Sequence, residues 1–354
     1  MKIKLSPAEL EKTYKLLDTK EINMSIADLL FQTFEETSFF IGSNTADSFY
    51  HRLLKFWDIS KDKTDDIKIL EKWVKHSIFP LKADYFSINP YYNTVKPIPV
   101  KEGKYELNYL SYKPYQPFSL DDITVDEKDY YLERSPLGYF TKENPYLVLS
   151  YDNEVWMCIT PNEINTMEPS IKQAKGDVLV LGLGLGYYPF MISLKEEVKD
   201  ITIIELDEKI IDIFNKHLLP LFPHKEKIHI IKGDGINYLK NNQKHFDTVF
   251  MDLWHNPEDG LPLYIQLKRL ENDNSTIYQY WLEKSLIALY RRCLLTVYEE
   301  SLQGYKDKDY QTSSNEIEKI INSIYFKTKN ITINAYDDIY KLLSDDSIIK
   351  LIIS

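Results

Sequence analysis

The sequence predicts an α/β fold in which a parallel sheet carries helices on both faces. Three observations predict it. Four short apolar segments lie at residues 178–181, 201–204, 228–231 and 248–251, helical periodicity separates them, and each is followed within three residues by glycine or an acidic residue. Strands that are buried on both faces form near-continuous apolar runs, as these do. Because the carboxyl ends of parallel strands share one edge, we expect a ligand site there.

The first strand runs into three alternating glycines, Gly182, Gly184 and Gly186. Glycine suits a turn with positive φ and allows backbone N–H groups to approach a ligand closely. A dinucleotide-binding turn places its third glycine one position later, where this chain has Tyr187. The spacing therefore disfavours a nicotinamide dinucleotide.

The residues after the second and third strands favour a nucleoside without phosphate. Glu205 ends the second strand, where a carboxylate can accept two hydrogen bonds from ribose hydroxyls. Asp234 can accept from an adenine amine, and Gly235 leaves room for the ring. Asp207 is expected to cap the next helix. We therefore expect S-adenosylmethionine (SAM) as the cofactor.

The motifs GDVLVLGLGLG, IIELDEKIID, KGDGINYL and FDTVFMDLW resemble those of class I SAM-dependent methyltransferases and, within that superfamily, of the spermidine synthase group. The resemblance covers about 80 to 90 residues, or about 130 if the preceding hairpin is counted, and implies a Rossmann-like class I methyltransferase sheet. It also implies that the glycine turn, the acidic residue after the second strand and the Asp-Gly after the third bind the cofactor.

The substrate residues of that group do not carry over. Spermidine synthases place a glutamine in the hairpin before this region, where the chain has Val-Trp-Met at 155–157. Their following helix has an acidic pair with Tyr-His-Glu; here Glu163 and Glu168 remain, and the tyrosine and histidine are missing. Their Asp-Ser-Ser-Asp-Pro after the fourth strand is here Asp-Leu-Trp-His-Asn-Pro at 252–257.

The expected catalytic residue is Asp252, which ends the fourth strand and could orient or deprotonate an acceptor. Trp254, His255 and Glu163 are expected to line the substrate pocket. The substitutions in the polyamine site favour methyl transfer from SAM to a small or peptide-like acceptor. Three alternatives remain: aminopropyl transfer from decarboxylated SAM, a SAM-binding scaffold without turnover, and an enzyme that uses NAD.

Composition limits the class of protein. The chain has 354 residues, enough for two domains, and a net charge of −11, which disfavours nucleic-acid partners. Its two cysteines, Cys158 and Cys293, are expected to be buried thiols, and its seven histidines form no metal-ligand pair. No apolar segment resembles a signal or a membrane span, so we expect a cytoplasmic protein without a metal.

Four segments are expected along the chain: a helical and Pro/Tyr-rich domain (1–129), a β-hairpin with a linking helix (130–175), the SAM-binding domain (176–300) and a C-terminal extension (301–354). Helices are expected near the N-terminus from residue 6 and at 25–40, 45–57 and 64–76, forming a lid or a homodimer surface. An ordered linker is favoured at 80–129.

After Gly260 the pattern becomes helical. Helices are expected at residues 262–270, 275–298 and 316–326, and late strands could form at 331–334 and 348–353. The sequence thus predicts a helical C-terminal extension.

Overall fold

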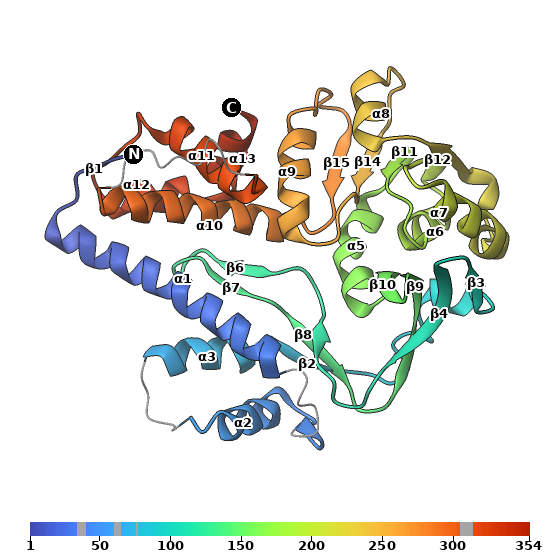
Figure 1. Ribbon diagram of the computed structural model, residues 1–354, viewed down its shortest axis with the longest axis horizontal. Coiled ribbons are helices and arrows are strands. Elements are labelled where there is room, and N and C mark those ends of the chain that lie inside the picture. Colours follow the sequence, from blue (N-terminus) through green and yellow to red (C-terminus); the bar gives the residue numbers. More distant parts are fainter. Residues whose placement is uncertain (34–39, 60–64, 76, 305–313) are drawn as a thin grey trace.

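The computed structural model describes residues 1–33, 40–59, 65–75, 77–304 and 314–354. Its centre is a five-stranded parallel sheet in the order β13-β12-β11-β14-β15 (Figure 1). The strands are β11 (Gly176–Leu181), β12 (Val198–Glu205), β13 (Ile228–Lys232), β14 (Thr248–Met251) and β15 (Ile277–Tyr280). The expected Rossmann-like sheet is confirmed. Its strand order reverses at β11 and β14, the place where open α/β sheets bind ligands.

Both faces of the sheet are covered. All four residues of β14 are buried, as are the last four of β11, and successive residues of a strand point to opposite faces. The helices of this part of the chain are α5 (Pro161–Gln173), α6 (Tyr187–Ser193), α7 (Glu208–Ile213) with the π-helical turn η2 (Phe214–Leu218), α8 (Gly235–Asn241), α9 (Pro257–Lys268) and α10 (Glu283–Leu302).

The helix expected at 275–298 is wrong at its start. Residues 277–280 form β15, which pairs with β14, and α10 begins only at Glu283, after Leu282 in a left-handed conformation. A short apolar run fits either a strand or a helix, and the sequence alone could not decide between them.

The C-terminal part is mostly helical, as expected. It contains α11 (Glu316–Thr328), α12 (Tyr336–Leu342) and α13 (Asp345–Ile353). The strand considered at 348–353 is wrong, because α13 occupies it. The other late strand exists as β16 (Thr332–Ile333), which pairs in parallel with β1 (Lys2–Ile3) at the N-terminus.

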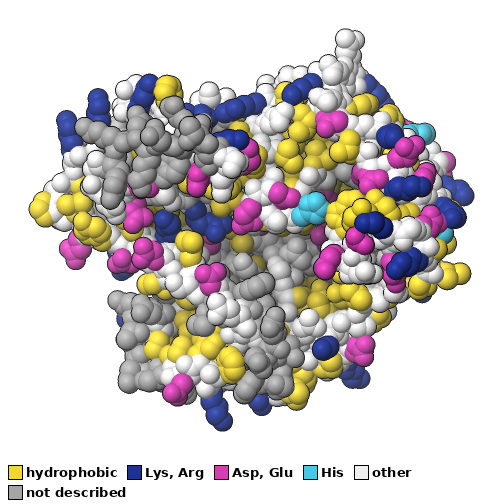
Figure 2. Space-filling view, in the orientation of Figure 1, with side chains coloured by type: hydrophobic (Ala, Val, Ile, Leu, Met, Phe, Trp, Pro, Cys, Tyr) yellow, Lys and Arg dark blue, Asp and Glu magenta, His cyan; other side chains and the backbone are white. Residues whose placement is uncertain are grey.

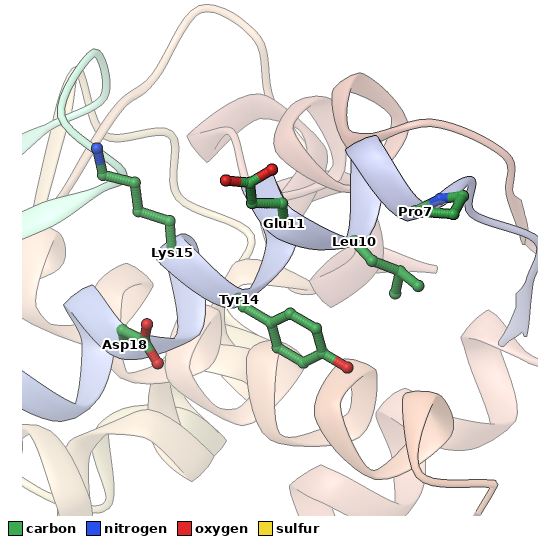
Figure 3. A pocket seen from close by; sticks show the side chains of 6 residues that line it. All are labelled: Pro7, Leu10, Glu11, Tyr14, Lys15 and Asp18. Atoms are coloured by element: carbon green, nitrogen blue, oxygen red, sulfur yellow. The ribbon is translucent and has the colours of Figure 1, made fainter.

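The N-terminal helices are α1 (Pro7–Thr33), α2 (Ala46–Phe56) and α3 (Asp65–Lys75). One continuous α1 replaces the first expected helix and the second as far as residue 33. Residues 34–39 of the second expected helix, the start expected at 64 and the end expected at 76 lie outside the described residues. The helix α1 packs on α10, where Thr13 Oγ1 lies 3.1 Å from the Tyr298 hydroxyl. A surface pocket lined by Pro7, Leu10, Glu11, Tyr14, Lys15 and Asp18 lies along α1, on the far side of the molecule from the parallel sheet (Figures 1 and 3).

The linker favoured at 80–129 is wrong. This part of the chain and its continuation form α4 (Pro90–Thr94) and the strands β2 (Ile78–Leu81), β3 (Val100–Glu102), β4 (Tyr105–Tyr112), β5 (Phe118–Ser119), β6 (Thr124–Asp126), β7 (Leu132–Arg134), β8 (Leu137–Phe140), β9 (Asn144–Tyr151) and β10 (Glu154–Cys158). Tyrosines that appeared as linker residues lie in β4, which pairs with β9 over eight residues across the expected boundary at 129/130.

We call the four strands β10-β9-β4-β3 the hairpin sheet. The strands β9 and β10 form the expected β-hairpin, and its turn has positive φ of 54° at Asp152 and 70° at Asn153. The hairpin sheet is attached to the parallel sheet: Glu102 lies 2.8 Å from His217 Nε2 in η2, and the Tyr105 hydroxyl donates to Asp207 Oδ2 at 3.0 Å. The second bond holds the hairpin sheet at the carboxyl end of β12.

None of the described helices is long and apolar enough to cross a membrane. On the face in Figure 2, acidic and basic side chains are interspersed among apolar ones.

Candidate active site

The surroundings of the three glycines in the turn after β11 differ in how they would accommodate a side chain. All have positive φ, 96° at Gly182, 54° at Gly184 and 77° at Gly186. A Cβ on Gly182 would lie 2.0 Å from the backbone oxygen of Asp252, and one on Gly186 would lie 2.3 Å from the Phe214 ring. A Cβ on Gly184 would meet no described atom within 4 Å. Packing therefore requires the outer two, whereas Gly184 faces open space that a ligand could use.

Glu205 ties the glycine turn to the end of β12. Its Oε2 accepts from the Leu183 N–H at 3.0 Å, and its Oε1 accepts from the Asp207 N–H at 2.8 Å. A carboxylate offers about four acceptor positions, so these two bonds leave capacity for ribose hydroxyls. The side chain is held rigidly where the expected nucleoside would lie.

Asp234 and Gly235 lie at the same edge, after β13. Asp234 caps α8, because its Oδ1 accepts from the Asn237 N–H at 2.7 Å. Gly235 is buried, and a Cβ on it would lie 3.3 Å from Leu253 and 3.4 Å from Leu181. The strand order thus brings the expected cofactor residues to one edge of the sheet.

Asp252 and Glu163 add two carboxyl groups to this edge. Asp252 follows β14, and its N–H donates to the Leu181 oxygen at 2.9 Å. Glu163 lies in the first turn of α5, which is capped by Thr160, whose hydroxyl accepts from the Glu163 N–H at 3.4 Å. Both side chains are half-buried.

Burial and like charge perturb both acids. Burial and, to a smaller extent, the Glu205 charge together raise the pKa of Asp252 to about 7. Burial also raises the pKa of Glu163 well above its usual range, and the Asp252 charge adds to this. A cation among these three carboxyl groups would relieve the cost of ionising them. The arrangement therefore suits a positively charged ligand and places a base with a near-neutral pKa beside it.

The expected pocket residues Trp254 and His255 lie in different surroundings. Trp254 is buried, and a Cβ on Gly260 of α9 would lie 2.7 Å from its indole. It packs inside the domain rather than lining an open mouth. His255 is exposed: its Nε2 lies 2.9 Å from Trp156 Nε1, and its Nδ1 lies 3.1 Å from Asp259 Oδ2.

Sequence reasoning missed two residues at this edge, Trp156 of β10 and Tyr105 of β4. Trp156 was noted only as part of the segment that replaces a glutamine. Its contact with a histidine 99 positions away leaves no trace in local periodicity.

Residues 161–262 match the spermine/spermidine synthase domain. This part of the chain is a spermidine synthase-like domain. The chain is 25% identical over 125 residues to a polyamine aminopropyltransferase of Clostridium botulinum (34% of this chain, 42% of that protein). It is 32% identical over 78 residues to one of Methanocaldococcus jannaschii (22% and 27%). The chain thus spans less than half the length of these curated relatives.

Among solved structures, spermidine synthase from Thermotoga maritima is 14% identical, with a TM-score of 0.29 over 42% of this chain and 59% of that one. The fold rests on the strand order described above rather than on this likeness.

The expectation of methyl transfer is wrong on these findings. The matching domain is named for spermine and spermidine synthesis, and the two curated relatives described above are named for aminopropyl transfer, which was the first alternative. The error came from weighing missing neutral side chains of the polyamine site above the retained carboxylates.

Proposed function

We propose that the protein transfers an aminopropyl group from decarboxylated SAM to an amine. The observation that carries this proposal is the group of three carboxyl side chains, Glu163, Asp252 and Glu205, at the carboxyl edge of the sheet. Decarboxylated SAM bears a sulfonium and an ammonium and has no carboxylate, and amine acceptors are cations at neutral pH. An acidic site suits both. SAM carries a carboxylate, which the three carboxyl groups of this site would repel.

The nucleoside end of the donor would bind along the glycine turn. Gly184 leaves space for close approach, Glu205 would accept from the ribose hydroxyls, and Asp234 would accept from the adenine amine. The match of residues 161–262 to the spermine/spermidine synthase domain supports this orientation.

The reaction is a displacement at carbon. The acceptor nitrogen attacks the aminopropyl carbon bonded to the sulfonium, a C–N bond forms, and the C–S bond breaks with its electron pair going to sulfur. The leaving group is neutral methylthioadenosine. The acceptor must be a free amine when it attacks, and Asp252, with its pKa raised to about 7, would take its proton. Glu163 would hold the ammonium at this or the far end of the acceptor.

The test is incubation of the full chain with decarboxylated SAM and, separately, putrescine, cadaverine and spermidine, with products identified by mass spectrometry. We expect methylthioadenosine and one aminopropylated amine in equal amounts, and both should form at least about 100-fold more slowly with Asp252→Asn. Calorimetric titration should give tighter binding of decarboxylated SAM than of SAM. Preferential binding of SAM, or absence of product with every amine, would contradict the proposal.

A further inference from the structure

The hairpin sheet contacts the carboxyl edge at two places on either side of the glycine turn. At the end of β12, the Tyr105 hydroxyl donates to Asp207. Beyond the end of β14, Trp156 contacts His255. Because β11 lies between β12 and β14 in the sheet, the hairpin sheet spans the turn after β11. The Tyr105 and Trp156 rings connect the two contacts, with centroids 5.9 Å apart.

A β-bulge directs Trp156 toward His255. Val155 pairs with Ser150 and Met157 pairs with Leu149, so Trp156 between them has no partner in β9. Bulges often redirect a side chain beside an active site.

The contact defines the protonation of His255. An indole N–H can only donate, so Nε2, 2.9 Å from Trp156 Nε1, must be the acceptor and carry no proton. In the neutral ring the proton is then on Nδ1, which donates to Asp259 Oδ2 at 3.1 Å. Asp259 also accepts from the backbone N–H groups of His255 and Asn256, which keeps the ring in place.

We propose that the Trp156–His255 hydrogen bond is a latch that holds the hairpin sheet over the carboxyl edge and closes only while His255 is neutral. Protonation of Nε2 would remove the only acceptor that the ring offers to Trp156 and set two N–H groups against each other. The hairpin sheet would then be held to this edge through Tyr105 and the contacts of Glu102. Trp156 and His255 are thus positioning residues, and their kinetic role rests on the proposed function.

Few charged groups lie close enough to His255 to affect its protonation. Among the described residues, Asp259 of α9 is the charged group that contacts the His255 ring. The hairpin sheet presents the phenols of Tyr105 and Tyr151 beside Trp156, and burial raises the pKa of Tyr105 to about 12, so it stays neutral. The Asp259 carboxylate, whose pKa is lowered by bonds from Asn256 and His255 against the effect of burial, keeps its charge through the range in which histidines titrate.

The first test is amide hydrogen exchange of the full chain at pH 8, which needs no substrate. Trp156→Phe keeps a ring but loses the donor, and His255→Ala loses the acceptor. Both variants should increase the rate of amide exchange about three- to tenfold in residues 144–158 and 252–260. This is the change expected when one neutral hydrogen bond is lost. His255→Gln offers an amide oxygen as acceptor and should exchange like the wild type. Tyr151→Phe, in the same aromatic cluster, is the matched control.

The second test follows the Trp156 indole N–H by 15N NMR, with its resonance assigned from the Trp156→Phe variant. In the wild type this resonance should shift when the pH is lowered until the His255 ring protons report protonation of the ring. In His255→Gln it should stay in place. The latch would be refuted if the indole resonance changed neither with pH nor in His255→Ala. It would also be refuted if amide exchange in Trp156→Phe equalled that of the wild type.

A third measurement separates the latch from the proposed reaction. With decarboxylated SAM and an amine that is turned over, Trp156→Phe should raise the KM for the amine several-fold and leave kcat within twofold. Unchanged kinetics despite faster exchange would refute its role in positioning. No turnover by the wild type, with the exchange and NMR results as expected, would refute the proposed function and leave the latch standing.

Discussion

Replacing Asp252 with asparagine should make the protein more stable and less active. Burial and the Glu205 charge raise the pKa of Asp252 from 3.8 to about 7. Below about pH 4 the carboxyl is protonated in both states. Between about pH 4 and 7 the native state keeps a proton that the unfolded chain has lost, so stability falls as pH rises through this window. Above pH 7 the full cost of a buried charge is present.

The pKa change sets the size of the effect. At about 1.4 kcal/mol for each pKa unit, the cost at pH 8 has an upper limit of about 4 kcal/mol. Because the side chain is half-buried and partly screened by water, we expect about 1 to 3 kcal/mol. For a chain of 354 residues this corresponds to a Tm increase of roughly 1 to 4 °C in Asp252→Asn.

The assay is thermal unfolding of wild type and Asp252→Asn at pH 4 and pH 8, with turnover measured at pH 8. The gain in Tm should be present at pH 8 and absent at pH 4, and kcat should fall about 100- to 10,000-fold with the loss of a general base. In the wild type, kcat/KM should rise with pH through about 7. An equal gain in Tm at both pH values would refute the charge argument. Turnover within tenfold of wild type would refute the role as base.

Two further predictions concern the glycine turn and Glu163. Gly184→Val should weaken nucleoside binding at least 100-fold in calorimetry and change Tm by only a few degrees, because its side chain enters open space. Gly182→Val should unfold the domain, because its Cβ would lie 2.0 Å from a backbone oxygen. Normal nucleoside binding by Gly184→Val would remove this turn from the site. Glu163→Gln should raise the KM for the amine about ten- to a hundredfold through loss of a charged partner, with the rise of rate near pH 7 retained. An unchanged KM would place the acceptor elsewhere.

The parallel sheet could be predicted because its strands are buried on both faces, and each polar residue after a strand comes to one edge through topology alone. The placement of Gly184, Glu205, Asp234 and Asp252 at this edge was predicted in this way. No side-chain contact between distant segments had to be known.

Of the hairpin sheet, the β-hairpin formed by β9 and β10 was predicted, but its pairing with β4 and its attachment to the parallel sheet could not be. Its attachment depends on pairs far apart in the sequence, Tyr105 with Asp207 and Trp156 with His255, and on a bulge that local periodicity does not reveal. β15 was missed for a different reason: its four residues also fit a helical pattern.

The choice of acceptor depends on which side chains were kept and which were replaced. Buried carboxyl groups determine the charge of a ligand, so the retention of Glu163 and Asp252 keeps the site suited to an amine. Neutral residues determine its shape. This chain lacks the tyrosine that spermidine synthases have in the helix after the hairpin. In the same helix, the Thr166 hydroxyl accepts from Trp281 Nε1 at 2.9 Å. That hydroxyl is used within the protein. The same charge with a different lining predicts an amine acceptor whose length or branching differs from that of putrescine.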